Sequence, residues 1–461
     1  MHFLLAIFFG GISSLAFEPL GFWYCALFGL AGWYWALTQH KLKQRVLISY
    51  LFGLSILLPT QHWTGIYVGN LPWLILCFSQ ALLFIAPALL MRRNHRANQL
   101  IFPLSYVAVE LLLRTVPFTG FGWSRLSLTQ TDSPYDYIYR QIGLSGMALV
   151  IATIVILRSI KHVLILAVII ASIYFIPDNV IENRPIKVAL VQGGVVNLGL
   201  DFNDKPREVF MRHFNQTAAS ISPSAVNLII WPENAVDVDV FRNNDIRIAI
   251  EKLSQDLDTP ILVGAVTRSS QGLNNQAILF KPKISQTYSK RYLTPFGEYL
   301  PLRSVSESVS KYATKIDDFY PGKKFITFNV EDVKFNSLIC YELINDSFTK
   351  ENVNDFLVIQ TNNATFGDTA QLDQQLNIAR VRAIESGRWV AYVSTTGITS
   401  FIDVDGNVTK SLEKFEPGTS IKEITTYSGR TNVQRIGHWI EIISVGFLVT
   451  ILGYRRWKMD V

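Results

Sequence analysis

Long apolar runs in the first 180 residues constrain the fold of this chain more than any other feature. Hydrophobic residues make up 49% of the 461 residues and charged residues only 17%, and the apolar excess is concentrated in these runs. A run of about 20 apolar residues is long enough to cross a bilayer as a helix, and helices this long in a soluble core seldom lack a polar stripe. The sequence therefore predicts eight membrane spans, at residues 3–18, 21–38, 46–64, 71–91, 99–114, 140–157, 162–177 and 438–454.

Basic clusters at the ends of these spans predict their orientation. The clusters are Lys41, Lys43 and Arg45; Arg92, Arg93 and Arg96; Arg158 and Lys161; and Arg455, Arg456 and Lys458. All four fall on the cytoplasmic side if the N-terminus is cytoplasmic, as the positive-inside rule requires, although Arg114, Arg125 and Arg140 fall outside. We therefore expect a membrane domain over residues 1–177, an extracytoplasmic domain over 178–437, and a final helix with a cytoplasmic tail over 438–461.

The net charge of +6 does not indicate nucleic-acid binding, because much of the basic excess lies in these clusters and no dense basic patch is interleaved with aromatic residues. The first run could be taken for a signal peptide. It has no basic segment before it, and a second run follows at once, so a membrane span is the better interpretation.

The predicted extracytoplasmic domain has the pattern of an α/β fold. Short apolar, strand-like runs occur at residues 186–192, 226–233, 259–266, 274–280, 333–342, 355–362 and 389–396. Helical patterns lie among them at about 205–220, 242–257 and 370–387, and the turn "VDGNV" separates two late strands. Continuous apolar strands that alternate with helices favour a sheet covered on its faces.

Three chemically active residues follow predicted strands of this domain. Glu233 ends "LIIWPE", Lys290 lies past another strand, and Cys340 ends "FNSLIC". In open α/β sheets, working residues gather where strands end. A thiol that attacks a carbonyl needs a base and a donor for the oxyanion, and a carboxylate and an ammonium group meet those needs.

Each of these three residues alone is weak evidence for catalysis, and the other cysteines and histidines do not point to a different site. A single strand-end Glu, Lys or Cys is more often structural than catalytic. Cys25 and Cys77 fall in predicted spans as small apolar residues, and no residue spacing indicates a metal site. Of the seven histidines, only His213 falls clearly inside the domain, in an amphipathic helix that favours a surface position.

The motifs around these residues resemble the nitrilase superfamily and, within it, the apolipoprotein N-acyltransferase family. The resemblance rests on "WPEN", "YSKRYLTPFGE" and "CYE", in that order, and on "FEPLGFW", "TGFGW", "VALVQG" and "ARVRAIESGRWV". It covers nearly the whole chain, including the spans at both ends. It implies an α-β-β-α sandwich on an eight-helix membrane base, and a bacterial inner-membrane protein with its catalytic domain on the periplasmic side.

The resemblance also implies roles for six residues and two substrates. Cys340 would be the nucleophile, Glu233 the general base and Lys290 the oxyanion stabiliser, and Glu298, Tyr341 and Glu342 would also be needed. A phospholipid would donate a fatty acyl chain through a Cys340 thioester to the α-amine of a diacylglyceryl-cysteine at the N-terminus of an apolipoprotein. No cofactor or metal is implied.

The chain departs from the family in three segments that border the site. The usual "NDAWFG" is "NNATFG" (362–367), the usual "NNG" is "TTG" (395–397), and the usual "QGN" is "QGG" (192–194). Two other functions stay open at this stage. One is a membrane-tethered amidase that uses the same three residues. The other is a transporter or receptor, for which Glu18 and Glu110 are the main acidic candidates within the spans.

Overall fold

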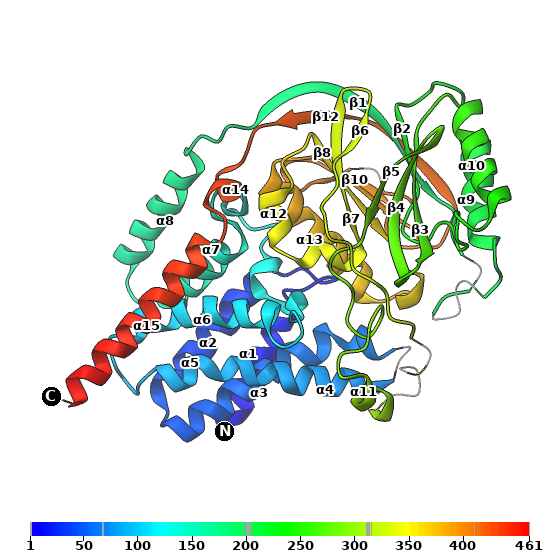
Figure 1. Ribbon diagram of the computed structural model, residues 1–461. Coiled ribbons are helices and arrows are strands. Elements are labelled where there is room, and N and C mark those ends of the chain that lie inside the picture. The colour runs from blue at the N-terminus through cyan, green and yellow to red at the C-terminus, as the bar shows by residue number, and fades with distance from the viewer. Residues whose placement is uncertain are drawn as a thin grey trace. The chain divides into compact units, whose positions relative to one another are not determined.

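The computed structural model describes residues 2–66, 69–195, 197–199, 204–309, 314, 316–409 and 411–460, with backbone only at 305, 308–309 and 455–460. The side chains of Arg455, Arg456 and Lys458 therefore lie outside the described part. The chain forms two compact units, one of residues 1–178 and 432–461 and the other of residues 179–431 (Figure 1).

The first unit is helical, and each predicted apolar run falls on helix. The helices are α1 (His2–Ser14), α2 (Tyr24–Gln39), α3 (Leu42–Thr60), α4 (Asn70–Ala81), α5 (Ile85–Leu90), α6 (Asn98–Thr115), α7 (Ile138–Ile154), α8 (Ile160–Tyr174), α14 (Asn432–Ile436) and α15 (Trp439–Asp460). Short 3₁₀ turns lie between them at His62–Gly65, Leu82–Phe84, Gly122–Ser124 and Leu126–Thr129.

Two helical stretches of the described residues, Leu42–Thr60 and Asn70–Leu90, are long and apolar enough by themselves to cross a membrane. Shorter apolar helices occur at His2–Ser14, Ile138–Ile154, Ile160–Tyr174 and Trp439–Tyr454. The positions of the predicted helices thus agree with the structure, but helix length and composition alone do not confirm eight spans.

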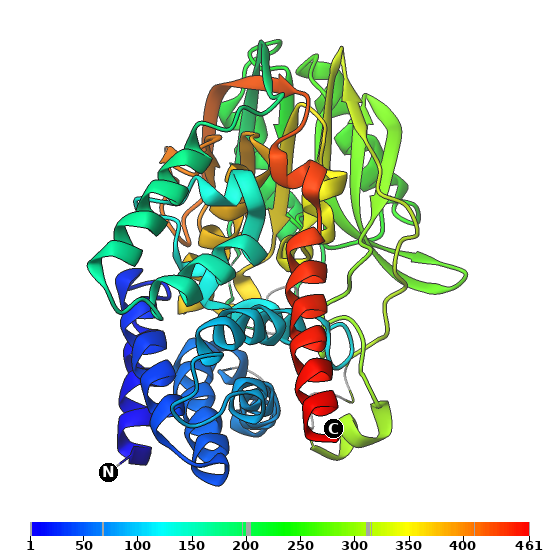
Figure 2. The ribbon, with the colours of Figure 1, turned by 90° about the vertical axis from the view of Figure 1, so that its left-hand side faces the viewer.

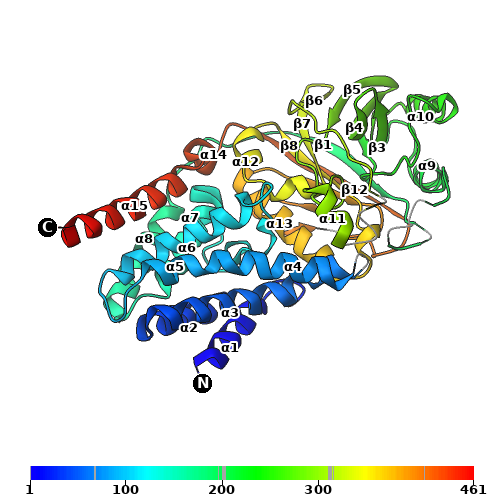
Figure 3. The ribbon, with the colours of Figure 1, turned by 60° about the horizontal axis from the view of Figure 1, so that its bottom comes forward.

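Contacts between distant parts of the chain hold this unit together. The helix α1 packs against α2 and α3, and α15 packs against α6 (Figures 2 and 3). An ion pair joins Arg114 of α6 to Glu441 of α15, and Ser145 Oγ of α7 donates to Glu441 Oε1 at 2.6 Å. The C-terminal helix is therefore fixed to the N-terminal helices by buried charge as well as by apolar packing.

The second unit contains two mixed sheets. The first has the strand order β12 (Gly418–Ser428), β1 (Ile181–Gln192), β2 (Leu228–Ile230), β3 (Ile261–Ser269), β4 (Gly272–Lys281) and β5 (Lys283–Ser289). The second has the order β11 (Val408–Thr409), β10 (Ser400–Ile402), β9 (Val390–Ser394), β8 (Phe356–Thr361), β7 (Val333–Ile339) and β6 (Phe328–Val330). In each sheet the three central strands, β1–β2–β3 and β7–β8–β9, are parallel, and the flanking strands are antiparallel.

The two sheets pack face to face with helices outside them. One apolar core lies between the sheets and includes Leu190 and Ile230 from the first and Phe335 and Val358 from the second. A second core lies between the first sheet and the helices α9 (Glu208–Ser220) and α10 (Asn244–Asp256). On the second sheet, α13 (Ala370–Ser386) packs against β9 and β10. The order of layers is therefore α-β-β-α, as the resemblance implied (Figure 1).

Shorter elements complete this unit and place the ends of the strands. They are α11 (Arg303–Val309), α12 (Ser347–Glu351) and the 3₁₀ turns η6 (Cys340–Ile344) and η7 (Ala364–Phe366). The strands β5, β6 and β12 were not predicted. The sequence of β12 alternates between partly exposed and buried residues at a sheet edge, so it lacks the continuous apolar run that marks a central strand.

Candidate active site

The predicted site residues come from loops at the ends of strands in both sheets. Glu233 follows β2 and Lys290 follows β5, both in the first sheet, and Cys340 follows β7 in the second. Each side chain is at most 9% exposed. Because the facing sheets bring these strand ends together, the three residues and Glu298 form one buried polar cluster.

Glu233 is held by donors to both of its carboxylate oxygens. Asn275 Nδ2 donates to Oε1 at 2.7 Å, and the backbone N–H of Asn362 donates to Oε2 at 2.8 Å. Burial raises the pKa of Glu233 above its ordinary value, although the positive charge of Lys290 opposes that rise. The carboxylate is thus oriented by neutral donors and has a strengthened affinity for a proton, as a general base requires.

Lys290 lies between two carboxylates. Its Nζ is 2.8 Å from Glu298 Oε2 and 3.4 Å from Glu233 Oε1. Asn275 Nδ2 also donates to Glu298 Oε1 at 2.8 Å, so one amide bridges the two acids. Burial acts against the ammonium charge, but the charges of Glu298 and Glu233 outweigh it and raise the pKa of Lys290. Lys290 therefore stays protonated as a fixed positive charge.

Cys340 occupies a strained backbone position at the end of β7. Its φ is +50°, in the left-handed region that costs a residue with a Cβ free energy. The thiol is free and buried. Burial, and then the negative charge of Glu233, raise the pKa of Cys340 to about 12, while the charge of Lys290 acts in the opposite direction. The sulfur therefore keeps its proton until a base removes it.

Glu342 ties the Cys340 turn to the loop that carries Lys290. Its Oε1 accepts from the Tyr288 hydroxyl at 2.7 Å and from the Arg291 N–H at 2.6 Å, and its Oε2 accepts from the Ile339 N–H at 2.9 Å. Burial raises the pKa of Glu342 to about 7, against the effect of these donors. This carboxylate connects β5 of the first sheet to the turn after β7 of the second, so its geometry is that of a positioning group.

Tyr341, the next predicted residue, lies buried in the same 3₁₀ turn between Cys340 and Glu342.

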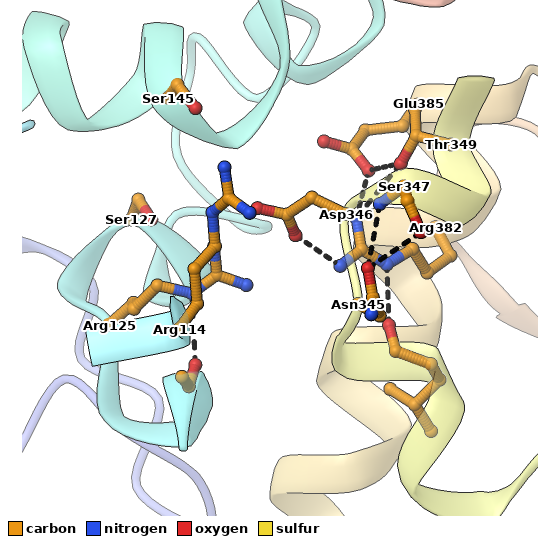
Figure 4. A network of polar contacts seen from close by, with 12 residues as sticks. Arg114, Arg125, Ser127, Ser145, Asn345, Asp346, Ser347, Thr349, Arg382 and Glu385 are labelled. Carbon is orange, nitrogen blue, oxygen red and sulfur yellow. Dashed lines mark hydrogen bonds and ion pairs between the residues drawn. The ribbon is translucent and has the colours of Figure 1, made fainter. Parts of the chain in front are cut away.

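A buried arginine holds the far end of this turn. Arg382 Nε donates to the carbonyl of Leu343 at 2.6 Å, and its Nη2 lies 2.7 Å from Asp346 Oδ1 (Figure 4). Its Nη1 pairs with Glu385 and donates to Thr349 Oγ1 at 3.1 Å. The guanidinium thereby joins α13 to the segment that follows Cys340.

His213 corrects a prediction, because it is fully buried rather than on the surface of α9. Its ring lies against Gly193, where an added Cβ would be 2.6 Å from Nδ1, and Nδ1 lies 2.8 Å from the carbonyl of Val209. Burial lowers the pKa of His213 to about 4. The glycine makes room for the ring. In the described part of the chain, no contact joins this neutral histidine to a residue of the site.

Comparisons with known proteins match both parts of the chain. Residues 9–157 match the apolipoprotein N-acyltransferase N-terminal domain, and residues 187–431 match carbon-nitrogen hydrolase. An apolipoprotein N-acyltransferase of Mycolicibacterium smegmatis is 30% identical over 96% of this chain and 83% of its own length. One of Haemophilus ducreyi is 28% identical over 99% of this chain and 97% of its own.

The chain belongs to the apolipoprotein N-acyltransferase family. Among solved structures, a CN-hydrolase superfamily protein of Xanthomonas campestris overlaps 52% of this chain and 91% of its own, with 17% identity and a TM-score of 0.41. The match of residues 187–431 to carbon-nitrogen hydrolase assigns the second unit to the nitrilase-type fold.

Three residues at the site were not predicted from the sequence. Asn275, Asn362 and Gln375 contact Glu233 or Cys340, and all three are buried. Asn275 lies within the strand β4 and Gln375 within the helix α13. A single polar residue inside such an element gives no sign in the sequence that it faces a reacting group. Asn362 opens "NNATFG", so the departure from the family motif was the one signal that pointed to this segment.

Proposed function

We propose that the protein transfers a fatty acyl chain from a membrane phospholipid, through a thioester on Cys340, to the α-amine of the diacylglyceryl-cysteine of an apolipoprotein. One observation carries the proposal: a buried free thiol lies in the same cluster as a carboxylate with a raised pKa and a lysine fixed between two acids. Membership of the apolipoprotein N-acyltransferase family supplies the substrate class.

In the first half-reaction, Glu233 accepts the proton of Cys340 while the sulfur attacks the ester carbonyl carbon. The high pKa of the thiol means that proton transfer accompanies the attack. Lys290 stabilises the oxyanion, a contribution typically worth about 3–4 kcal/mol. When the C–O bond breaks, Glu233 returns the proton to the oxygen of the lysophospholipid, and a thioester is left.

In the second half-reaction, the acceptor amine attacks the thioester carbonyl. Glu233 takes a proton from the attacking nitrogen, the C–S bond breaks, and the departing sulfur receives the proton. The products are an amide and the free thiol, which is a ping-pong sequence. Glu298 and Glu342 act by position in both halves, since one holds Lys290 and the other joins the two catalytic loops.

We also propose the arrangement in the membrane. The helices of the first unit form an eight-span base in a bacterial inner membrane, residues 1–177 and 438–461, and residues 178–437 lie on the periplasmic side. The four basic clusters support this orientation. Both substrates are anchored in lipid, which accounts for a membrane base much larger than a tether requires.

An acyl-transfer assay tests the reaction. Vesicles would contain the full-length protein, a phospholipid with a mass-tagged acyl chain, and a diacylglyceryl-cysteine peptide. With the wild-type protein, the tag is expected on the peptide as an amide. A peptide with a blocked α-amine should receive no tag. With the Cys340→Ala protein, no peptide should receive the tag. Hydrolysis of soluble amides without tag transfer would instead support the amidase, and full activity of Cys340→Ala would contradict the mechanism.

A labelling experiment tests the topology. Single cysteines would replace Ser270, in the exposed turn between β3 and β4, and Arg93, in a predicted cytoplasmic cluster. A membrane-impermeant thiol reagent added to spheroplasts is expected to label the first and not the second. The reverse pattern would place the catalytic unit in the cytosol and contradict the proposal.

A further inference from the structure

A line of buried hydrogen bonds leads from the backbone after β9 to the sulfur of Cys340. The Gly397 N–H donates to Ser394 Oγ at 2.8 Å, and this hydroxyl donates to Asn363 Oδ1 at 2.6 Å. Asn363 Nδ2 then donates to Gln375 Oε1 at 2.8 Å, and Gln375 Nε2 donates to Cys340 Sγ at 3.6 Å. The side chains of Ser394, Asn363 and Gln375 are all 0% exposed, so water does not compete for these bonds.

The backbone fixes the direction of every bond in this line. The Ser394 hydroxyl accepts from the N–H of Gly397 and from the N–H of Thr396 at 3.4 Å, which uses both of its acceptor positions, so its own hydrogen is directed to Asn363. Asn363 must then present its oxygen to Ser394 and its NH₂ group to Gln375. It follows that the oxygen of Gln375 faces Asn363 and that its NH₂ group faces the sulfur.

Further contacts favour the same orientation of the Gln375 amide, and the one from Gln371 also depends on Asn363, whose Nδ2 donates to Gln371 Oε1 at 2.8 Å. The Thr361 hydroxyl, the Tyr392 hydroxyl and Gln371 Nε2 each donate to Gln375 Oε1 at 3.1 Å. Turning the amide over would set its NH₂ group against the NH₂ group of Gln371 and its oxygen against the sulfur, although the two hydroxyls could accept from it. Three elements, β8, β9 and α13, therefore orient one amide group.

We propose that Gln375 is a catalytic residue that donates a hydrogen bond to the developing thiolate of Cys340, and that Asn363 and Ser394 are positioning residues for its amide. The reacting atom is one that the proposed function uses, so the inference deepens that function. A buried sulfur that gains negative charge needs donors, and a hydrogen bond to a charged group is stronger than one to a neutral group.

Asn363 is a position at which this chain departs from the family motif. Where the family has "NDAWFG", this chain has Asn363 in "NNATFG". An Asp carboxylate at this position would offer acceptors only, and it could not donate to Gln375 Oε1. The amide of Asn363 is therefore required by the orientation in which Gln375 serves the sulfur.

The substitution Gln375→Glu tests the donor. The new carboxylate still accepts from Thr361, Tyr392 and Asn363, so these contacts of the side chain are kept, but it has no N–H for the sulfur. We expect alkylation of Cys340 by iodoacetamide to slow about 10- to 100-fold at neutral pH. Its pH midpoint should rise, and thioester formation from phospholipid should slow in parallel. Gln374→Glu, the same change one residue earlier in α13, is the matched control and should alkylate as the wild type does.

The substitution Asn363→Asp tests the positioning line. Alkylation of Cys340 should be slower in this variant too, because the NH₂ group of Gln375 then turns toward the new carboxylate and away from the sulfur. Wild-type alkylation in Gln375→Glu would overturn the role of Gln375, and slow alkylation in Gln375→Glu alone would overturn the line through Asn363. Alkylation uses no lipid, so absence of acyl transfer by the wild type would reject the proposed function separately.

Discussion

The ammonium group of Lys290 lies 2.8 Å from Glu298 Oε2, closer than its 3.4 Å distance from Glu233 Oε1. Glu298 therefore holds the lysine, and Glu233 Oε2, which accepts from the Asn362 N–H, has a second acceptor position for a proton. In Glu298→Gln the lysine should move toward Glu233 and neutralise the base. We expect acyl transfer to fall about 10- to 100-fold, because the substitution removes one charge-assisted hydrogen bond at the reacting centre. Steady-state transfer rates would check this, and an unchanged rate would contradict the role of Glu298.

The raised pKa of Glu233 predicts an acid limb in the pH profile of thioester formation. In the proposed mechanism Glu233 is a base only when ionised, so the rate should rise with pH through a midpoint above the ordinary glutamate value of 4.5. The negative charge of Glu298 contributes to that raised pKa. The limb should accordingly move to lower pH in Glu298→Gln. Single-turnover rates across pH would measure both midpoints, and a shift to higher pH would contradict this electrostatic account.

The substitution Arg382→Lys is expected to lower the stability of the protein. The guanidinium of Arg382 serves Leu343, Thr349, Asp346 and Glu385 at once, and a lysine ammonium cannot reproduce that fork. Loss of one charge-assisted bond would lower the free energy of unfolding by about 1.5–3 kcal/mol.

Thermal melting of Arg382→Lys in detergent would show the loss as a lower midpoint. The control is Arg247→Lys in α10, whose partly exposed pair with Glu251 contributes only about 0–1 kcal/mol. Equal midpoints for the two variants would argue against a buried role for Arg382.

Gly397→Ala should disturb the line of hydrogen bonds that reaches Cys340. An added Cβ would lie 2.5 Å from Asn363 Oδ1 and 2.9 Å from Ser394 Oγ, both buried and bonded. Overpacking of this kind typically costs about 1–3 kcal/mol. A lower melting midpoint and slower alkylation of Cys340 are both expected. Gly446→Ala in α15, where an added Cβ meets nothing within 4 Å, is the control.

The sequence predicted the strand-end residues because their strands are distinctive. The run before Glu233 is continuously apolar, and the strand before Cys340 ends in the buried apolar residues Leu338 and Ile339; both are central strands, whose ends carry function in α/β domains. The strand before Lys290, "KISQTYS", mixes polar and apolar residues at a sheet edge and was missed. The sequence placed Lys290 past a strand, but the run nearest before it in the prediction was 274–280, one strand earlier than β5.

The contacts between the two sheets could not be predicted from the sequence. Glu342 bonds to Tyr288 and Arg291, about fifty positions earlier, and the motif "CYE" shows that a carboxylate is present but not what it binds. The same holds for Gln375, which reaches Cys340 only because α13 packs against the second sheet. Such pairs depend on how the layers pack, which local patterns do not encode.

The central claim is that Cys340 takes up a fatty acyl chain, and intact mass of the protein incubated with phospholipid tests it most directly. In the absence of acceptor peptide, the wild type should gain the mass of one acyl group, which hydroxylamine removes and which Cys340→Ala lacks. Addition of a diacylglyceryl-cysteine peptide should discharge the adduct. An unmodified wild-type protein, or an equal adduct on Cys340→Ala, would contradict the account.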